Sequence, residues 1–394
     1  MKIEVSERVK NLPPYILGQL KSLVLARRQA GADIIDLNMG NPADPPPRQV
    51  VDKLREAVLD PRNSRYSTAG GVFNLRRDIA LKWKRKWGVD LDPEDQVIAT
   101  IGSKEGFSHL CLALLGPGDT VVVGDPAFQI HSYAVVLAGG RTIPVPLGAD
   151  DAFLARIDRV LDETEPTPRA MVLNFPHNPT GITVEPSFFD QVVRIAHDRG
   201  VMVIHDFAYG ETCFDGYPAP SFLQADGAAD VGVEFATLSK PYNMAGWRIG
   251  LCVGNREMIA ALARIKGYYD YGIFQAVQIA AIIAMREGDE HVLEQAAVYQ
   301  ERRDVMVEGV RSLGWAVDVP RAGMFVWARV HPDHLVRFGG RTMDFSLAMV
   351  DEAEVAMTPG AAFGPGGEGH VRMALVENRQ RIRQGLRQLG RALA

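Results

Sequence analysis

The segment TLSKPYNMAGWRIG, residues 237–250, places an amine and a guanidinium close together in a loop rich in small residues. Lys240 lies directly before Pro241, and Arg248 follows eight positions after the lysine. Because proline restricts its own backbone and that of the preceding residue, this loop can hold its lysine in one place. A fixed lysine can attack a carbonyl carbon, and an arginine can bind a phosphate or a carboxylate. A lysine at a strand end is usually a solvated charge, so the segment alone identifies no site.

The segment GSKEGF, residues 102–107, follows an apolar run and opens a predicted helix. Free backbone N–H groups and the positive end of the helix dipole allow such a helix start to bind a phosphate. Ser103 and Lys104 would add donors to this site. An ordinary helix start capped by Ser103 also explains the segment, and the spacing is not that of a P-loop.

Two more polar segments follow predicted strands. NFPHNPTG carries Asn178 in a tight turn, and VMVIHDFAYG ends its strand at Asp206, with Tyr209 three residues later. Ligands of α/β proteins bind beyond the carboxyl ends of the strands, so Asn178, Asp206 and Lys240 could reach one ligand from three connections. Turn formation and capping are simpler explanations for each segment alone. His205 has no further ligands at a telling spacing, so we assign it a structural role and predict no metal site.

Taken together, these groups meet the needs of chemistry with pyridoxal 5′-phosphate. A lysine amine forms a Schiff base with the aldehyde of this cofactor. A carboxylate keeps the pyridine nitrogen protonated, so that the ring can accept electrons from a carbanion. A phenol and an amide can hold the phenolate oxygen of the ring, and a helix start can hold the phosphate. An arginine fork can then bind the substrate carboxylate at two points.

The elements that must position these residues alternate along the middle of the chain. Apolar runs predict strands there, and amphipathic patterns between them predict helices. Near-continuous apolar strands are typical of a parallel sheet that is covered on both faces, as in α/β proteins. The predicted strands are 96–102, 120–125, 169–176, 201–207 and 233–239, and the predicted helices include 103–115, 186–199 and 256–266.

The two ends of the chain differ from its middle. Residues 290–314 read as one long amphipathic helix, and short strands and a closing helix follow it. A chain of 394 residues is also too long for one typical core. We therefore expect residues 1–45 to form an N-terminal arm and part of a small domain, residues 46–285 a large cofactor-binding domain, and residues 286–394 the rest of the small α+β domain.

Composition and charge exclude several classes of protein. The chain is 47% hydrophobic and 23% charged, which is typical of a globular protein and argues against disorder. Its net charge of −5, with both signs well mixed, predicts no nucleic-acid partner and no membrane partner. Three widely spaced cysteines and an N-terminus without an apolar signal core predict a reduced, cytoplasmic protein.

The ordered set of motifs resembles the class I aminotransferases, which have fold type I of the pyridoxal-phosphate enzymes. The order is GNP, SKEG, NPTG, D-x-x-Y, SK with G-W-R-I-G, and a late arginine in HVRMAL. LPPYIL, MGNPADP, IGSKEGFSHL, HDFAYG and the lysine loop are most similar to bacterial glutamate–pyruvate (alanine) aminotransferases, and LL-diaminopimelate aminotransferases share similar motifs. The resemblance covers nearly the whole chain. It implies a large α/β domain with a mixed, mostly parallel sheet beside a smaller α+β domain.

The resemblance also implies a role for each motif at the cofactor. Lys240 would form the internal aldimine and then move the proton between the substrate Cα and the cofactor's C4′. Asp206 would pair with the pyridinium nitrogen, and Asn178 and Tyr209 would hold the phenolate oxygen. The expected phosphate ligands are Ser103, Lys104, Thr237 and Arg248, with Ser239 assisting the phosphate or shaping the loop.

Other residues are implied to bind the substrate or to stack on the ring. Arg372 would receive the α-carboxylate, with the backbone of Gly40 and the amide of Asn178 beside it. Phe128 would stack on the cofactor ring without the hydroxyl that the tyrosine of many relatives supplies. Tyr66 would reach the phosphate of the neighbouring subunit, which requires a homodimer with shared active sites.

The substrate side chain is indicated less directly. Dicarboxylate-specific aminotransferases place a second arginine near the distal carboxylate, whereas the segment 264–274 offers Tyr268, Tyr269 and Tyr271. Polar and aromatic contacts favour small or varied side chains such as that of alanine, while glutamate must also fit as the usual amino donor. Tyr15 either closes over the substrate or packs as a core aromatic residue.

We therefore predict an aminotransferase that moves an amino group between alanine or glutamate and pyruvate or 2-oxoglutarate by ping-pong chemistry. The alternative keeps the cofactor and takes LL-diaminopimelate, or a broad set of donors including methionine. A pyridoxal-phosphate-binding transcriptional regulator would need a DNA-binding domain, but only about forty residues precede MGNP and the net charge is acidic. A nicotinamide dehydrogenase is disfavoured because no G-x-G-x-x-G follows a predicted strand.

Overall fold

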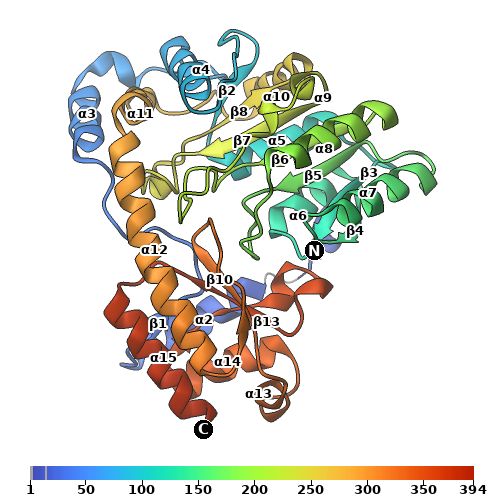
Figure 1. Cartoon of the computed structure of the whole chain (residues 1–394). Coiled ribbons are helices and arrows are strands. Elements are labelled where there is room, and N and C mark those ends of the chain that lie inside the picture. Colours follow the sequence, from blue (N-terminus) through green and yellow to red (C-terminus); the bar gives the residue numbers. More distant parts are fainter. Residues whose placement is uncertain (1–2, 14–15) are drawn as a thin grey trace.

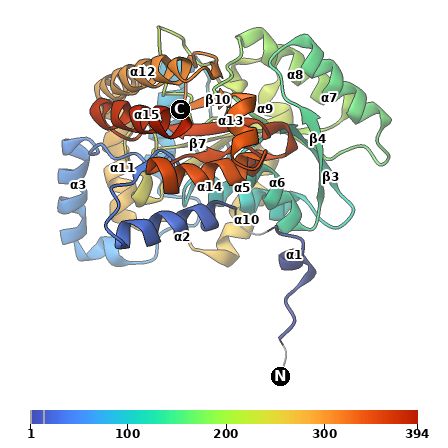
Figure 2. The ribbon, with the colours of Figure 1, turned by 90° about the horizontal axis from the view of Figure 1, so that it is seen from below.

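The computed structural model describes residues 3–13 and 16–394 (Figure 1). The prediction for Tyr15 therefore lies outside the described residues. The described residues form a seven-stranded sheet in the middle of the sequence, a smaller four-stranded sheet near the C-terminus, and a two-stranded sheet that pairs segments from the two ends of the chain. The short helix α1 (Glu7–Lys10) buries none of its residues and projects from the body of the molecule (Figure 2).

The larger sheet has seven strands in the order β2-β8-β7-β6-β5-β3-β4. Strand β8 runs antiparallel to both β2 and β7, and every other neighbouring pair is parallel. The predicted mixed, mostly parallel α/β sheet is thus confirmed. Its strands are β2 (Val97–Thr100), β3 (Thr120–Asp125), β4 (Arg141–Pro146), β5 (Ala170–Asn174), β6 (Met202–Asp206), β7 (Gly232–Thr237) and β8 (Gly250–Gly254).

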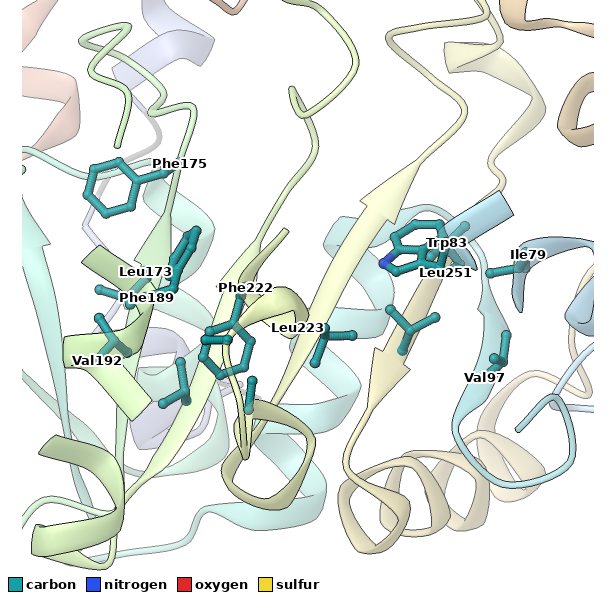
Figure 3. Packing of buried hydrophobic residues seen from close by; sticks show 14 of the residues in the cluster. Ile79, Trp83, Val97, Leu173, Phe175, Phe189, Val192, Phe222, Leu223 and Leu251 are labelled. Carbon is teal, nitrogen blue, oxygen red and sulfur yellow. The ribbon is translucent and has the colours of Figure 1, made fainter. Parts of the chain in front are cut away.

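Helices cover both faces of this sheet. Helices α5, α6 and α10 pack on one face through residues such as Phe107 and Leu262. The opposite face buries Trp83, Phe189 and Phe222 with their neighbours (Figure 3). The helices around the sheet are α3 (Arg48–Leu59), α4 (Phe73–Trp87), α5 (Ser103–Leu114), α6 (Gln129–Ala138), α7 (Asp151–Glu163), α8 (Pro186–Arg199), α9 (Ala228–Val231), α10 (Arg256–Tyr269) and α11 (Gln275–Glu287).

The smaller sheet is antiparallel, in the order β12-β13-β10-β9. A two-residue strand near the N-terminus, β1 (Ile35–Asp36), pairs with β11 (Val355–Ala356) and brings the two chain ends together. The domain boundaries at residues 45 and 285 stay a prediction. The remaining elements are α2 (Ile16–Gln29), α12 (Asp289–Ser312), β9 (Ala316–Val317), β10 (Phe325–Arg329), α13 (Pro332–Arg337), α14 (Thr342–Ala353), β12 (Thr358–Pro359), β13 (His370–Ala374) and α15 (Arg379–Leu393).

The long helix α12 connects the two halves of the structure and runs from the larger sheet's side down to the smaller sheet (Figure 1). The carboxyl ends of β3, β5, β6 and β7 face the smaller sheet, so loops that follow these strands meet residues of β10 and β13. Within the described part of the chain, no helix is both long and apolar enough to cross a membrane.

Candidate active site

A cavity of about 290 Å³ lies at the carboxyl ends of the parallel strands, where ligands of α/β proteins bind. Its walls contain every site residue predicted above except Tyr15 and Tyr66. These predicted residues are Gly40, Ser103, Lys104, Phe128, Asn178, Asp206, Tyr209, Thr237, Ser239, Lys240, Arg248 and Arg372. The cavity is also lined by residues that the sequence did not indicate: Met39, Asn41, Gln129, Ala208, Ala245 and Phe325.

Lys240 follows β7 by three residues and extends its amine into the cavity. Its Nζ donates a hydrogen bond of 2.5 Å to the carbonyl oxygen of Gly40. Burial, followed by the positive charges of Arg372 and Arg248, lowers the pKa of the Lys240 amine to about 8, against the opposing effect of Asp206. An amine with this pKa is partly unprotonated near neutral pH, which makes it a usable nucleophile.

Asp206 ends β6 and is almost fully buried. One carboxylate oxygen lies 2.9 Å from Nε2 of His131, and the other accepts the N–H of Ala208 at 3.1 Å. His131 lies in the first turn of α6, and nothing in its local sequence marks it as a partner of a residue 75 positions away. The histidine is not among the described residues that line the cavity, and its contact orients the carboxylate.

Arg372 projects from β13 and joins the two halves of the site. Its Nη1 donates to the side-chain oxygen of Asn178 at 2.8 Å, and its Nη2 donates to the carbonyl oxygen of Asn38 at 3.0 Å. The guanidinium carbon lies 4.0 Å from the ring centre of Phe325 and 4.7 Å from that of Phe363. These two rings hold the guanidinium plane in place.

The start of α5 forms one end of the cavity. Its N-cap is Gly102 rather than Ser103, and no side chain caps the first turn, so the backbone N–H groups there have no side-chain acceptor. A Cβ on Gly102, whose φ is 78°, would lie 2.1 Å from Nη2 of Arg248. Only glycine therefore lets the arginine approach this helix start. Burial, and then the charge of Arg248, lower the pKa of Lys104.

Three other residues predicted to bind the cofactor also line the cavity: Thr237, Ser239 and Tyr209. The hydroxyl of Thr237 donates to the carbonyl of Ile249 at 3.1 Å and lies 2.9 Å from the hydroxyl of Ser239, and these contacts shape the lysine loop. Tyr209 is buried against Phe325, and burial raises the pKa of its phenol. All of these groups are donors or aromatic surfaces, as a phosphate and an aromatic ring would require.

Tyr66 lies outside the cavity and is 91% exposed, with its ring centre 5.6 Å from that of Tyr271. Tyr268 and Tyr269 are also exposed, so none of these tyrosines lines the cavity of this chain. His205 is fully buried instead, with Nδ1 3.0 Å from the carboxylate of Glu234. That contact agrees with the structural role predicted for His205.

Comparisons with known proteins converge on one family. Residues 32–389 match the family model described as "Aminotransferase class I and II". The glutamate–pyruvate aminotransferase AlaC of Escherichia coli is 46% identical over 96% of this chain and 92% of its own length. The LL-diaminopimelate aminotransferase of Moorella thermoacetica is 41% identical over 99% of both chains. A double mutant of Thermus thermophilus aspartate aminotransferase superposes with a TM-score of 0.90 at 25% identity, covering 99% of this chain and 100% of its own.

Proposed function

Because this chain belongs to the class I and II aminotransferases, and is an enzyme that transfers amino groups, we propose that its cofactor is pyridoxal 5′-phosphate. We propose alanine or glutamate as amino donor and pyruvate or 2-oxoglutarate as acceptor, with 46% identity to a glutamate–pyruvate aminotransferase in support. The 41% identity to an LL-diaminopimelate aminotransferase supports the alternative donor LL-diaminopimelate, and a broader donor range including methionine stays open beside it.

The residues of the cavity fit this cofactor. The uncapped first turn of α5, with Ser103, Thr237 and Arg248 beside it, offers donors and positive charge for a phosphate. Asp206 offers a buried carboxylate for a protonated ring nitrogen, and the half-buried ring of Phe128 offers a stacking surface. Lys240 offers the amine that an aldehyde needs.

Each residue would then do one part of the work. When bound, the cofactor supplies an electrophilic aldehyde and a ring that accepts electrons from a carbanion. Lys240, with a pKa of about 8, can take a proton from the substrate Cα and give it back. Arg372, held by Asn178 and the rings of Phe325 and Phe363, binds the α-carboxylate and thereby orients the Cα–H bond.

The observation that carries this proposal is that the amine of Lys240, the carboxylate of Asp206 and the guanidinium of Arg372 line one cavity. Among the described residues that line it, the arginines are Arg372 and Arg248, and Arg248 lies at the proposed phosphate site. A second arginine for a distal carboxylate is thus not among the described residues of this one chain that line the cavity, which supports alanine as donor, while glutamate would need another polar contact.

The test is a panel of amino donors ranked by kcat/KM with pyruvate and with 2-oxoglutarate. We expect alanine and glutamate to rank above methionine and LL-diaminopimelate. A kcat/KM for LL-diaminopimelate more than about tenfold above that for alanine would replace the preferred substrate with the alternative. Absence of transamination with every donor, in protein that shows the visible absorption of bound cofactor, would contradict the proposed function itself.

We further propose a homodimer that acts in the cytoplasm. In support, the exposed rings of Tyr66 and Tyr271 lie 5.6 Å apart, and large exposed apolar surfaces mark protein interfaces. The three cysteines are unpaired, as expected in a reducing compartment. Sedimentation equilibrium measures the oligomeric state, and a monomer at micromolar concentration would contradict the dimer.

A further inference from the structure

The segment between β1 and α3 crosses the cavity without helix or strand, and we call its residues 38–45 the strap. Its backbone is held near one end by Arg372 and by the hydroxyl of Thr358, which both donate to the carbonyl of Asn38 at 3.0 and 2.8 Å. In its middle, the carbonyl of Gly40 accepts the hydrogen bond from Lys240. Because regular secondary structure does not fix the strap, its position over the cavity depends on such side-chain contacts.

The other end of the strap is held by a partly buried ion pair. Both carboxylate oxygens of Asp44 accept hydrogen bonds of 2.8 Å from the two terminal nitrogens of Arg302 in α12. The side-chain nitrogen of Gln295, two turns earlier in α12, donates to Asp44 at 3.1 Å. Bidentate arginine–carboxylate pairs are directional as well as strong, so this contact fixes the strap in register with the helix. Burial, the largest single effect, raises the pKa of Asp44, but the hydrogen bonds and charge of Arg302 and the hydrogen bond from Gln295 together outweigh it and lower the pKa.

The same cluster reaches the two catalytic segments. Nη1 of Arg302 also donates to the carbonyl of Leu375 at 3.2 Å, three residues beyond Arg372. The side-chain nitrogen of Asn243, three residues beyond Lys240, donates to Gln295 at 2.8 Å and to the carbonyl of Pro45 at 3.2 Å. Arg302, Gln295 and Asn243 are all almost fully buried. We call the pair Asp44 and Arg302 the clamp. Together with Gln295 and Asn243, the clamp connects the strap, the lysine loop and the chain that follows β13.

We propose that Asp44 and Arg302 are positioning residues, which hold the strap in register with Lys240 and Arg372 and so set the affinity for the α-carboxylate. This inference rests on the proposed function, because it assumes that Arg372 binds that carboxylate. Release of the strap at Asp44 would leave it anchored at Asn38, and Gly40 would shift relative to Lys240. Since the α-carboxylate is shared by all amino and 2-oxo acid substrates, every one of them would bind more weakly.

The experiment compares Asp44→Asn and Arg302→Met with Arg303→Met in the cofactor-loaded enzyme. Arg303 is a matched control: it is the next residue of α12, is also buried, pairs with Asp215 and donates to the carbonyl of Pro320 at 3.0 Å. These contacts involve neither the strap nor the lysine loop. We expect the KM for the best donor and for its acceptor to rise about tenfold or more in the clamp variants, with kcat changed far less.

Hydrogen–deuterium exchange of residues 38–45 provides a second measurement that does not depend on turnover. Exchange of this segment should accelerate in Asp44→Asn and Arg302→Met and stay as in the parent enzyme in Arg303→Met. The Asp44→Asn/Arg302→Met double variant should have the KM of the single variants, because the two residues act as one unit.

Unchanged exchange and KM in the clamp variants would overturn the inference, and so would equal effects in Arg303→Met, which would indicate a general loosening of α12. A KM in the double variant that rises by the product of the two single-variant increases would also contradict the inference, because it would show that the two residues act independently. If the parent enzyme accepts neither alanine nor glutamate, the proposed function fails on its own. The exchange comparison, and the KM for whichever donor is accepted, then still decide whether the clamp positions the strap.

Discussion

At the scale of single residues, the lowered pKa of Lys240 makes a direct prediction. Burial, reinforced by Arg372 and Arg248, lowers this pKa to about 8, whereas an ordinary lysine has a pKa of about 10.4. Only the unprotonated amine reacts with an acylating reagent. Trace labelling of cofactor-free protein with acetic anhydride should therefore level off above about pH 8 and fall about tenfold per unit below it. Mass spectrometry of the peptide that contains Lys240 measures the rate.

The control for this measurement is any peptide with an exposed lysine, whose labelling should keep rising towards pH 10 because an ordinary amine is still mostly protonated there. Labelling of Lys240 that rises in parallel with that of the control peptide would show that its environment does not favour the neutral amine. Arg372→Gln should move the Lys240 profile to higher pH, since it removes one of the positive charges that disfavour protonation.

The residues proposed to react could be selected from the sequence and do line one cavity, whereas the residues that support them could not be selected. Lys240, Asp206 and Arg372 stand in motifs with a distinctive order and spacing, and all three line the cavity. His131 contacts Asp206, and Phe325 flanks Arg372, through pairings that arise only once the strands are side by side. No local pattern distinguishes such a histidine or phenylalanine from an ordinary core residue.

At the scale of elements, a buried lysine connects the helix at the proposed phosphate site to the end of α10. The Nζ of Lys266 lies 3.0 Å from the carboxylate of Glu105 and 2.9 Å from that of Asp270. Glu105 in turn accepts the N–H of Ile101, just before α5. Lys266→Met would leave the two partly buried carboxylates together without their cation. We expect the free energy of unfolding to fall by about 2–4 kcal/mol in urea titrations.

A double-mutant cycle with Glu105→Gln separates this charge effect from lost packing. The Lys266→Met/Glu105→Gln variant should be less destabilised than the sum of the two single variants, because removal of one carboxylate relieves the repulsion that the methionine exposes. Strict additivity would mean that Lys266 stabilises the protein through packing alone. Activity of the folded variants reports separately on whether the start of α5 stays in place.

The hydrophobic pattern of the sequence predicted those helices and strands that are largely buried and uninterrupted. Helix α8 matches its predicted range, Pro186–Arg199, because proline suits a first helical position and Gly200 takes a left-handed conformation after the last turn. The pattern did not predict β4 and β8. The edge strand β4 is largely exposed and contains two prolines, and β8 is a short run between glycines directly after the lysine loop. The prolines of β4 and the glycines at both ends of β8 weaken the strand signal of these two segments.

At the scale of the whole molecule, the approach of the smaller sheet to the larger one depends on a close contact at the end of β3. Asp125 accepts the N–H of Gly366 at 3.0 Å, in the segment that leads into β13 and Arg372. A Cβ on Gly364 would lie 2.3 Å from the same carboxylate. Gly364→Ala should push the two halves apart there and raise KM for amino acids several-fold, because Arg372 follows the displaced segment.

Backbone strain is the competing explanation, and Gly369→Ala isolates it. Gly369 has a φ of 84°, also in the left-handed region, but nothing lies within 4 Å of the position of its Cβ. Both alanine variants should lose about 1 kcal/mol or more of stability to strain, measured as a lower Tm. Only Gly364→Ala should also raise KM, since only its methyl group meets Asp125 across the interface. Equal KM values in the two variants would mean that strain, and not the contact between the two halves, governs substrate binding from this segment.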